Sequence, residues 1–213
     1  PHSAGSYCDE REGKGVPVMH EDEILVANDG GVRRIILNRP DRLNALTASI
    51  MQALCDAAAD AARDTSVGCV VVSGAGRGFC AGGDLKDGGG GRSLPASREH
   101  GSRTEQSFER LRGFMEAPHL LHEMPKPVIA MINGPVAGAG IGIAGACDLR
   151  FAGRSATFFT AFDRIGAGGD FGSTWFWSKI VGTGVARELF FLGEKLSAEE
   201  AFHKGLYTRI FED

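Results

Sequence analysis

Two glycine-rich segments, at residues 74–83 and 134–142, are the features of this sequence most suited to chemistry. Each follows a short apolar run of the kind found in strands that are buried on both faces. Glycine lets the backbone approach a ligand closely, and a loop that leads into a helix presents unpaired N–H groups at the positive end of the helix dipole. Two such loops can each aim one N–H at the same oxygen and so form an oxyanion hole. The alternative is that both are tight turns that pack helices against a sheet.

Asp170 is the acidic residue best placed for proton transfer. It stands just before a predicted helix and close in sequence to several aromatic residues. A carboxylate in aromatic surroundings loses hydration, which predicts a pKa raised towards the range useful for a general base. Two alternatives remain open: Asp170 caps the following helix, or Asp163, flanked by Phe162 and Arg164, is the acid instead.

Three further patterns favour structural roles. His119, His122 and Glu123 hint at a metal, but an H-x-x-H pattern without a third placed ligand is typical of a polar surface, so no metal site is expected. Cys80 lies in the first glycine segment, yet no histidine stands nearby in sequence to activate it, which favours packing. Residues 140–145 spell G-x-G-x-x-G, but Pro135 and other residues separate them from the preceding apolar run, which argues against a dinucleotide site.

Length and composition indicate a protein with a core of its own. The chain has 213 residues, of which 43% are hydrophobic and 23% charged. A net charge of −4 argues against nucleic acid as a partner. Five widely spaced cysteines without a C-x-x-C pair favour a reducing compartment. Because the sequence shows no apolar leader and no apolar run of about 20 residues, we expect a cytoplasmic protein without a membrane segment.

Alternating strands and helices position these segments. Residues 1–22 are predicted to be a flexible tail and residues 23–213 one domain. Helical crossovers between buried strands predict an α/β fold with a partly parallel sheet, in which ligands bind beyond the carboxyl ends of the strands. The predicted strands are 24–27, 32–37, 69–72, 128–132, 148–152 and 156–159; the predicted helices run from Thr47 or Ser49 to about Arg63 and over 104–123, 173–181, 185–192 and 197–203, the last with a capping box of Ser197 and Glu200.

An ordered set of short motifs resembles the enoyl-CoA hydratase/isomerase (crotonase) family. Their order and spacing agree with the family from about Glu23 to the end of the sequence. The motifs are Leu37-Asn38-Arg39-Pro40, Asn44-Ala45-Leu46, Gly78-Phe79-Cys80-Ala81-Gly82-Gly83-Asp84-Leu85, Asn133-Gly134-Pro135-Val136-Ala137-Gly138-Ala139-Gly140, Cys147-Asp148-Leu149-Arg150, Leu196-Ser197-Ala198-Glu199-Glu200-Ala201 and Gly205-Leu206.

The resemblance implies a crotonase-like α/β fold with a repeated β-β-α spiral core and C-terminal helices. It implies an acyl-CoA substrate, with coenzyme A as part of the thioester and no tightly bound cofactor. Family members continue into helices that cover the site and build trimers or dimers of trimers; this sequence stops at Asp213, so we expect those helices to be absent from it. By position, the resemblance makes the N–H groups of Gly83 and Ala139 the oxyanion hole, and places Arg42, Leu43, Ala81 and Leu85 near the adenine and phosphates of CoA.

One departure from the family bears on the reaction. Hydratases of the family hold and split water with two glutamates, whereas the matching positions here carry Gly142 and Phe162, which cannot move a proton. The aspartate that matches Asp170 resembles the acid/base of family isomerases, including ring-opening isomerases of aromatic acid breakdown, and the nucleophile of aryl-CoA dehalogenases. We therefore expect an isomerase that stabilises an enolate. The alternatives are a hydratase with acids at other positions, a non-catalytic acyl-CoA-binding relative and, more remotely, a nucleotide-dependent dehydrogenase.

Overall fold

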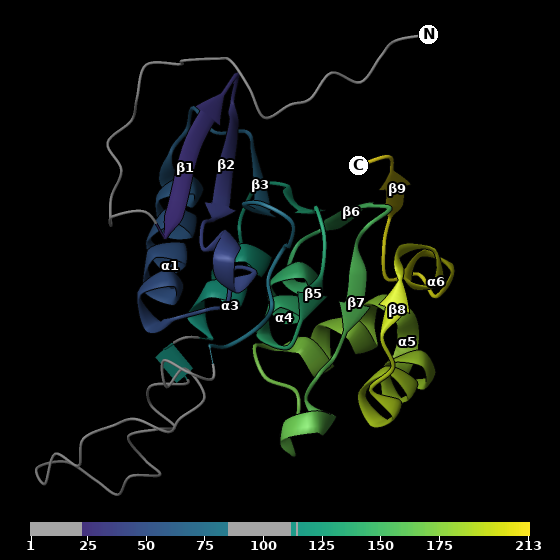
Figure 1. The fold of residues 1–213 in the computed structure, drawn as a ribbon. Helices are drawn as coiled ribbons and strands as arrows, with labels where there is room; N and C mark the ends of the chain where they lie inside the picture. The colour runs from purple at the N-terminus through teal and green to yellow at the C-terminus, as the bar shows by residue number, and fades with distance from the viewer. Residues whose placement is uncertain (1–22, 85–111, 114) are drawn as a thin grey trace, which may run out of the picture.

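The protein is built from two β-sheets and a row of helices (Figure 1). The computed structural model describes residues 23–84, 112–113 and 115–213, so the predicted tail and Leu85 lie outside the described residues. The larger sheet has the strand order β1-β2-β3-β4-β6-β9, and the smaller has the order β5-β7-β8. The strands are β1 (Ile24–Asp29), β2 (Val32–Leu37), β3 (Cys69–Gly74), β4 (Val128–Ile132), β5 (Val136–Ala137), β6 (Leu149–Gly153), β7 (Thr157–Phe159), β8 (Leu196–Ser197) and β9 (Arg209–Phe211).

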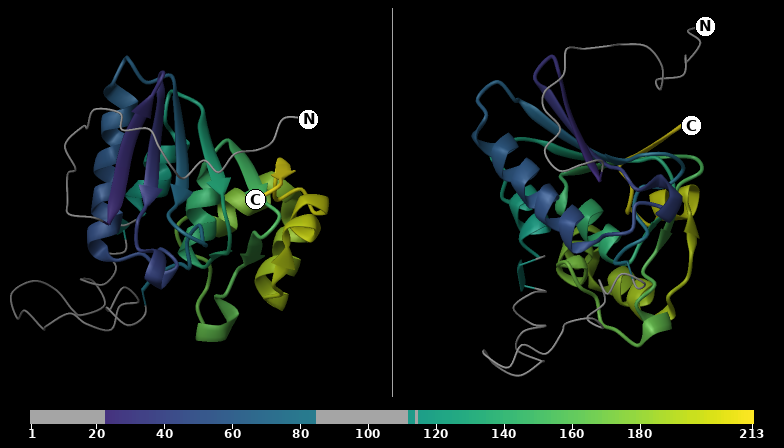
Figure 2. Two further views of the ribbon diagram at one scale, coloured as in Figure 1. Left: turned by 45° about the horizontal axis from the view of Figure 1, so that its top comes forward. Right: turned by 60° about the vertical axis from the view of Figure 1, so that its left-hand side comes forward.

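The helices lie between successive strands along the chain, and α4 and α6 each connect the smaller sheet to the larger one. They are α1 (Ala48–Arg63), α3 (Glu116–His122), α4 (Ala139–Ala146), α5 (Ser173–Leu192) and α6 (Ala198–His203), with short 3₁₀ turns η1 (Pro40–Arg42) and η2 (Asp163–Ile165). The first four of these helices contact one another in chain order, α1 with α3, α3 with α4 and α4 with α5. Figure 2 shows from two further sides how α1 runs along the strands of the larger sheet.

The chain repeats one unit of strand, short strand and helix. After β4 in the larger sheet come β5 in the smaller sheet and α4; after β6 come β7 and α5. In the units that begin with β2 and β3, isolated β-bridges take the place of the short strand. Leu46 pairs with Gly83, and Cys80 pairs with Val136. The repeated β-β-α core expected from the sequence is therefore confirmed.

The parallel strands of the larger sheet place both glycine segments at the same end of the sheet. β1 and β2, which correspond to the predicted strands 24–27 and 32–37, form an antiparallel hairpin in which Ile24 faces Leu37. From β2 onward, each neighbouring pair of strands is parallel. Because parallel strands end on one side of a sheet, the segments that follow β3 and β4 emerge next to each other.

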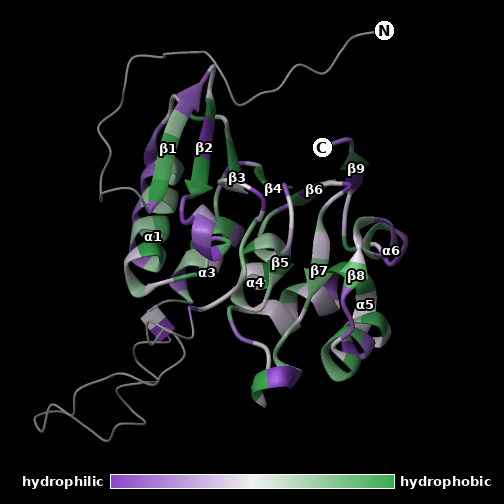
Figure 3. Cartoon of the chain, in the orientation of Figure 1, coloured by the Kyte–Doolittle hydropathy of each residue, from purple (hydrophilic) through white to green (hydrophobic). Residues whose placement is uncertain are grey.

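Helix α1 begins and faces the core as its sequence predicts. The Thr47 Oγ1 accepts a hydrogen bond from the Ile50 N–H at 3.2 Å, so Thr47 is the N-cap. Its apolar residues, among them Ile50 and Leu54, are buried. By contrast, every residue of α4 is buried, and this short helix is white to green throughout in Figure 3. A helix that is apolar on all sides belongs in the interior.

The predicted elements differ from the structure in three places. The helices expected at 173–181 and 185–192 are the two parts of α5, separated by Gly182 with a non-helical φ of 77°. The helix expected over 104–123 is described only from residue 112, and α3 begins at Glu116. The two-residue strands β5 and β8, and β9, were not predicted. The capping box of Ser197 and Glu200 at the start of α6 is confirmed.

Candidate active site

The first glycine segment is held in shape by a buried asparagine from another part of the chain. The Asn44 side chain is fully buried, and its Nδ2 donates to the carbonyls of Ala75 at 3.0 Å and Gly78 at 2.7 Å. Its Oδ1 accepts a hydrogen bond from the Arg39 N–H at 2.8 Å. One side chain therefore pairs three backbone groups, of which the Gly78 carbonyl has a second, longer hydrogen bond from the Asn133 Nδ2 at 3.4 Å.

A second asparagine and an ion pair complete this support. The Asn133 Nδ2, from the start of the second glycine segment, donates to the carbonyls of Gly74 and Gly76, each at 2.8 Å. At the far end of the first segment, the buried Asp84 carboxylate accepts from the Arg39 Nη1 at 3.0 Å. The sequence motifs included these side chains, but their supporting role follows only from the tertiary contacts.

The two glycine segments meet at Gly82 and Ala139. A Cβ added to Gly82 would lie 3.2 Å from the Ala139 nitrogen and 3.2 Å from the Gly138 Cα. Gly82 and Gly138 have positive φ values of 90° and 51°, which side chains rarely adopt. Glycine is therefore favoured at Gly82 by both the close approach and the positive φ, and at Gly138 by the positive φ.

Two backbone donors at this meeting point remain available. The Gly82 carbonyl and the Asp84 N–H both bond to Leu46, while the intervening Gly83 N–H has no acceptor among the described residues. Ala139 is the first residue of α4, and its N–H likewise has no acceptor in that part of the chain. An oxygen held between them would also feel the positive end of the α4 dipole.

The structure brings three of the predicted CoA-binding residues together. Arg42 is exposed in η1, and Leu43 follows it with a φ of 49°. The Leu43 carbonyl accepts the Ala81 N–H at 2.9 Å, so Arg42 and Leu43 lie beside the first glycine segment.

Asp170 lies in the turn between η2 and α5. Its Oδ1 is buried and has no hydrogen-bond partner among the described residues. Burial raises the pKa of Asp170 to about 6, since a carboxylate removed from water favours its neutral form. The direction of this shift agrees with the sequence-based expectation.

The residue after Asp170 fixes this turn against α4. Phe171 has a φ of 51°, an unfavourable conformation for a side chain with a Cβ. A Cβ added to Gly142 would lie 2.6 Å from both the Cβ and the carbonyl oxygen of Phe171. The Asp170 turn therefore packs on the first turns of the same helix that begins at Ala139.

The sequence left two alternatives open, in which Asp170 caps the following helix or Asp163 is the acid. The N-cap of α5 is Gly172, and no side chain caps the helix, so the interpretation of Asp170 as an N-cap is wrong. The Asp170 main-chain carbonyl, rather than its carboxylate, accepts the Ser173 N–H at 2.9 Å. Asp163 is exposed, and its carboxylate lies against Gly193 at the end of α5.

Gly142 and Phe162, the two positions that the sequence resemblance assigns to the hydratase glutamates, are both tightly packed. Gly142 has no room for a Cβ because Phe171 occupies that space. Phe162 is buried and stacks on Phe190 with ring centroids 6.0 Å apart.

The remaining sequence patterns have packing roles. Gly140, Gly142 and Gly145 lie inside α4, where their missing side chains make room for Cys80, Phe171 and Phe176 respectively, rather than in a loop that cradles phosphates. Burial raises the pKa of Cys80 to about 12, so its thiol stays protonated at neutral pH.

No group of three metal-binding side chains occurs within the described ranges. Within those ranges no helix is long and apolar enough to cross a membrane.

The chain is similar to known proteins over most of its length. The sequence matches the enoyl-CoA hydratase/isomerase family over residues 27–213. It is 37% identical over 190 residues to the 1,2-epoxyphenylacetyl-CoA isomerase of Escherichia coli K12, a match that covers 89% of this chain and 70% of the isomerase. It is also 37% identical over 193 residues to a Mycobacterium tuberculosis protein named as a probable enoyl-CoA hydratase, with 90% and 71% covered.

A solved structure extends the likeness to the fold. A protein of Thermobifida fusca described as an enoyl-CoA hydratase, in complex with CoA, superimposes with a TM-score of 0.79 at 26% identity, over 90% of this chain and 73% of that one. The chain therefore belongs to the enoyl-CoA hydratase/isomerase family of enzymes, which act on CoA thioesters. Both isomerases and hydratases are among the relatives, so family membership leaves the reaction open.

Proposed function

We propose that this protein is an enoyl-CoA isomerase, which moves a carbon–carbon double bond along the acyl chain of a CoA thioester. The observation that carries the proposal is Asp170, a carboxylate with a pKa of about 6 and one buried oxygen without a described partner. Its turn packs on α4, and the two positions assigned to the hydratase glutamates, Gly142 in α4 and Phe162 before η2, carry no acid. Among the relatives, the enoyl-CoA delta isomerase 2 of Rattus norvegicus, 31% identical to this chain, supports the same choice.

In the proposed reaction, the N–H groups of Gly83 and Ala139 donate to the thioester oxygen. These donors make the protons on C2 more acidic because they stabilise the negative charge that reaches the oxygen when C2 is deprotonated. In a 3-enoyl-CoA, that charge is delocalised over the oxygen, C2 and C4. Fixed donors lower the barrier without having to reorient during the reaction.

Asp170 then moves a single proton. With a pKa of about 6 it is mostly ionised at neutral pH and takes the proton from C2. The resulting carboxylic acid returns a proton to C4, which leaves the double bond between C2 and C3 and regenerates the carboxylate. No water is consumed, so one carboxylate is sufficient. Hydration, by contrast, requires groups that both deprotonate water and protonate carbon.

We further propose that CoA binds beside the first glycine segment. Arg42, with Leu43, Ala81 and Leu85, is assigned to the adenine and phosphates. The exposed Arg42 guanidinium supplies positive charge, and the hydrogen bond between Leu43 and Ala81 keeps two of these residues next to the proposed oxyanion hole.

The kinetics of Asp170→Asn test the assignment of the acid. Turnover of 3-hexenoyl-CoA to 2-hexenoyl-CoA is expected to fall by about a hundred- to ten-thousand-fold, the usual contribution of a general base. Binding of CoA, followed by calorimetry, is expected to stay unchanged because the amide keeps the shape of the side chain. Asp163→Asn is the matched control, since it removes an exposed carboxylate seven positions earlier in the sequence. An unchanged rate in Asp170→Asn, or equal losses in both variants, contradicts the assignment.

A further inference from the structure

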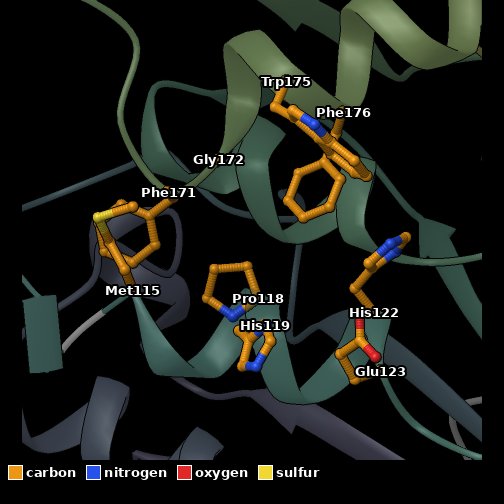
Figure 4. A pocket seen from close by; sticks show the side chains of 9 residues that line it. All are labelled: Met115, Pro118, His119, His122, Glu123, Phe171, Gly172, Trp175 and Phe176. Atoms are coloured by element: carbon orange, nitrogen blue, oxygen red, sulfur yellow. The ribbon is translucent and has the colours of Figure 1, made fainter.

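A cavity of about 300 Å³ opens between α3 and the start of α5 (Figure 4). Met115 and Pro118 come from the α3 side, and Phe171, Trp175 and Phe176 come from the α5 side. His119, His122 and Glu123 form a polar margin along α3. These three polar residues therefore border an otherwise largely apolar cavity.

The cavity begins one residue from the proposed acid. Phe171 follows Asp170 directly, and its ring lies on the cavity wall (Figure 4). The same residue packs on Gly142 of α4, the helix that carries the Ala139 N–H. Phe171 therefore links the turn that carries Asp170, and the helix that begins at Ala139, to the wall of the cavity.

The aromatic side chains of the cavity are held in place before any ligand binds. The Trp175 ring meets the Phe176 ring edge to face, with centroids 5.2 Å apart, and the His122 ring in the same manner at 5.3 Å. The Lys179 ammonium lies 5.7 Å from the centre of the Trp175 ring. Phe176 closes directly over Gly172, where an added Cβ would lie 2.7 Å from its ring. Trp175 thus has a defined position although about half of its surface is exposed, at 51%.

The size and lining of the cavity favour a ring as its occupant. An apolar protein cavity of about 150 Å³ is enough to bind benzene, so this one has room for a phenyl group and part of its linker. A flat ring gains edge-to-face contacts with fixed aromatic neighbours. A linear chain of similar size gains the apolar burial but gives up more rotational freedom on binding.

We propose that this cavity binds the aromatic ring of an aryl-substituted acyl-CoA, with Trp175 as the residue that sets this specificity. The proposal rests on the isomerase function proposed above. It assigns the polar margin of His119, His122 and Glu123 to the solvent-facing side of the ring, and Phe171 to the side nearest the proton transfer.

The test compares two substrates in the intact protein and in Trp175→Ala. The aryl substrate is 5-phenyl-3-pentenoyl-CoA, and the short linear one is 3-hexenoyl-CoA. Trp175→Ala is expected to lower kcat/KM for the aryl substrate by about ten-fold or more, mainly through KM, while kcat/KM for the linear substrate changes less than about two-fold. Trp175→Phe, which keeps a ring, is expected to restore most of the loss.

Phe191→Ala is the matched control, because Phe191 is 79% exposed on the same helix and does not line the cavity. The proposal is overturned if Trp175→Ala weakens both substrates equally, or if the aryl substrate is unaffected. If neither substrate is isomerised, the proposed reaction fails, and the cavity is tested separately by calorimetry with phenylacetyl-CoA and acetyl-CoA. Tighter binding of phenylacetyl-CoA that Trp175→Ala abolishes then still supports an aryl site; equal binding of the two thioesters overturns it.

Discussion

The first glycine segment and the Asp170 turn differ in whether their buried polar groups have hydrogen-bond partners. Carbonyls of the segment at residues 74–83 and the carboxylate of Asp84 directly after it are paired with Asn44, Asn133 and Arg39. In the turn, the Asp170 Oδ1 and the Ser173 Oγ are buried without hydrogen-bond partners in the described part of the chain. Phe171 in the same turn has a positive φ without being glycine.

This difference fits the two tasks proposed for the site. A pair of oxyanion donors must stay fixed, so side chains that tie the loop down serve that task. A carboxylate that exchanges a proton near neutral pH must not be stabilised in its charged form, so an acid with an unpartnered oxygen serves the other. Poor solvation of the ionised Asp170 lowers the free energy of unfolding.

The largest expected effect comes from removing the support of the glycine segment. Asn44→Ala removes three hydrogen bonds, those to the Arg39 N–H and to the carbonyls of Ala75 and Gly78. It is expected to lower the free energy of unfolding by about 3–4 kcal/mol, measured by urea denaturation. Asn28→Ala is the control, since that exposed side chain accepts one hydrogen bond, from the Arg33 Nε. Similar losses in the two variants would show that the segment does not depend on Asn44.

Asp170→Asn is expected to raise the free energy of unfolding, by less than Asn44→Ala lowers it. The pKa of Asp170 rises from its ordinary value of 3.8 to about 6 in the folded protein, so the folded state loses stability relative to the unfolded chain as pH rises from about 4 to above 6. Replacing the carboxylate removes this loss. The variant is therefore expected to be more stable than the native protein at pH 7.5, by at most about 3 kcal/mol, and to show little difference near pH 4.

Thermal unfolding at several pH values measures this difference. A gain in stability that does not vary with pH would indicate that burial of the Asp170 charge is not its cause.

Local sequence signals predicted most of the larger elements. Thr47 and the apolar spacing of α1, the Asn-Asp-Gly-Gly turn of the hairpin and the capping box at Ser197 each act through neighbouring residues, so they could be recognised without a structure. The short strands β5 and β8 could not, because two residues have no periodicity and depend on pairing with β7.

The parts of the candidate site that depend on local sequence signals could be predicted, whereas the parts that depend on contacts between distant residues could not. The glycine segments and Asp170 are visible in the sequence. The roles of Asn44 and Asn133 depend on contacts between residues 31 to 59 positions apart. The fit of Phe171 against Gly142 and the cavity beside α3 likewise require the packed structure.

Product analysis of two thioesters tests the central claim most directly. The intact protein is incubated separately with 3-hexenoyl-CoA and 2-hexenoyl-CoA, and the products are identified by mass and chromatography. Conversion of the 3-enoyl to the 2-enoyl thioester, without a hydroxyacyl product, is the result expected from an oxyanion hole with one carboxylate. Rapid hydration of the 2-enoyl thioester would contradict the account, because it would require acids where the chain has Gly142 and Phe162 or at positions not assigned to the site.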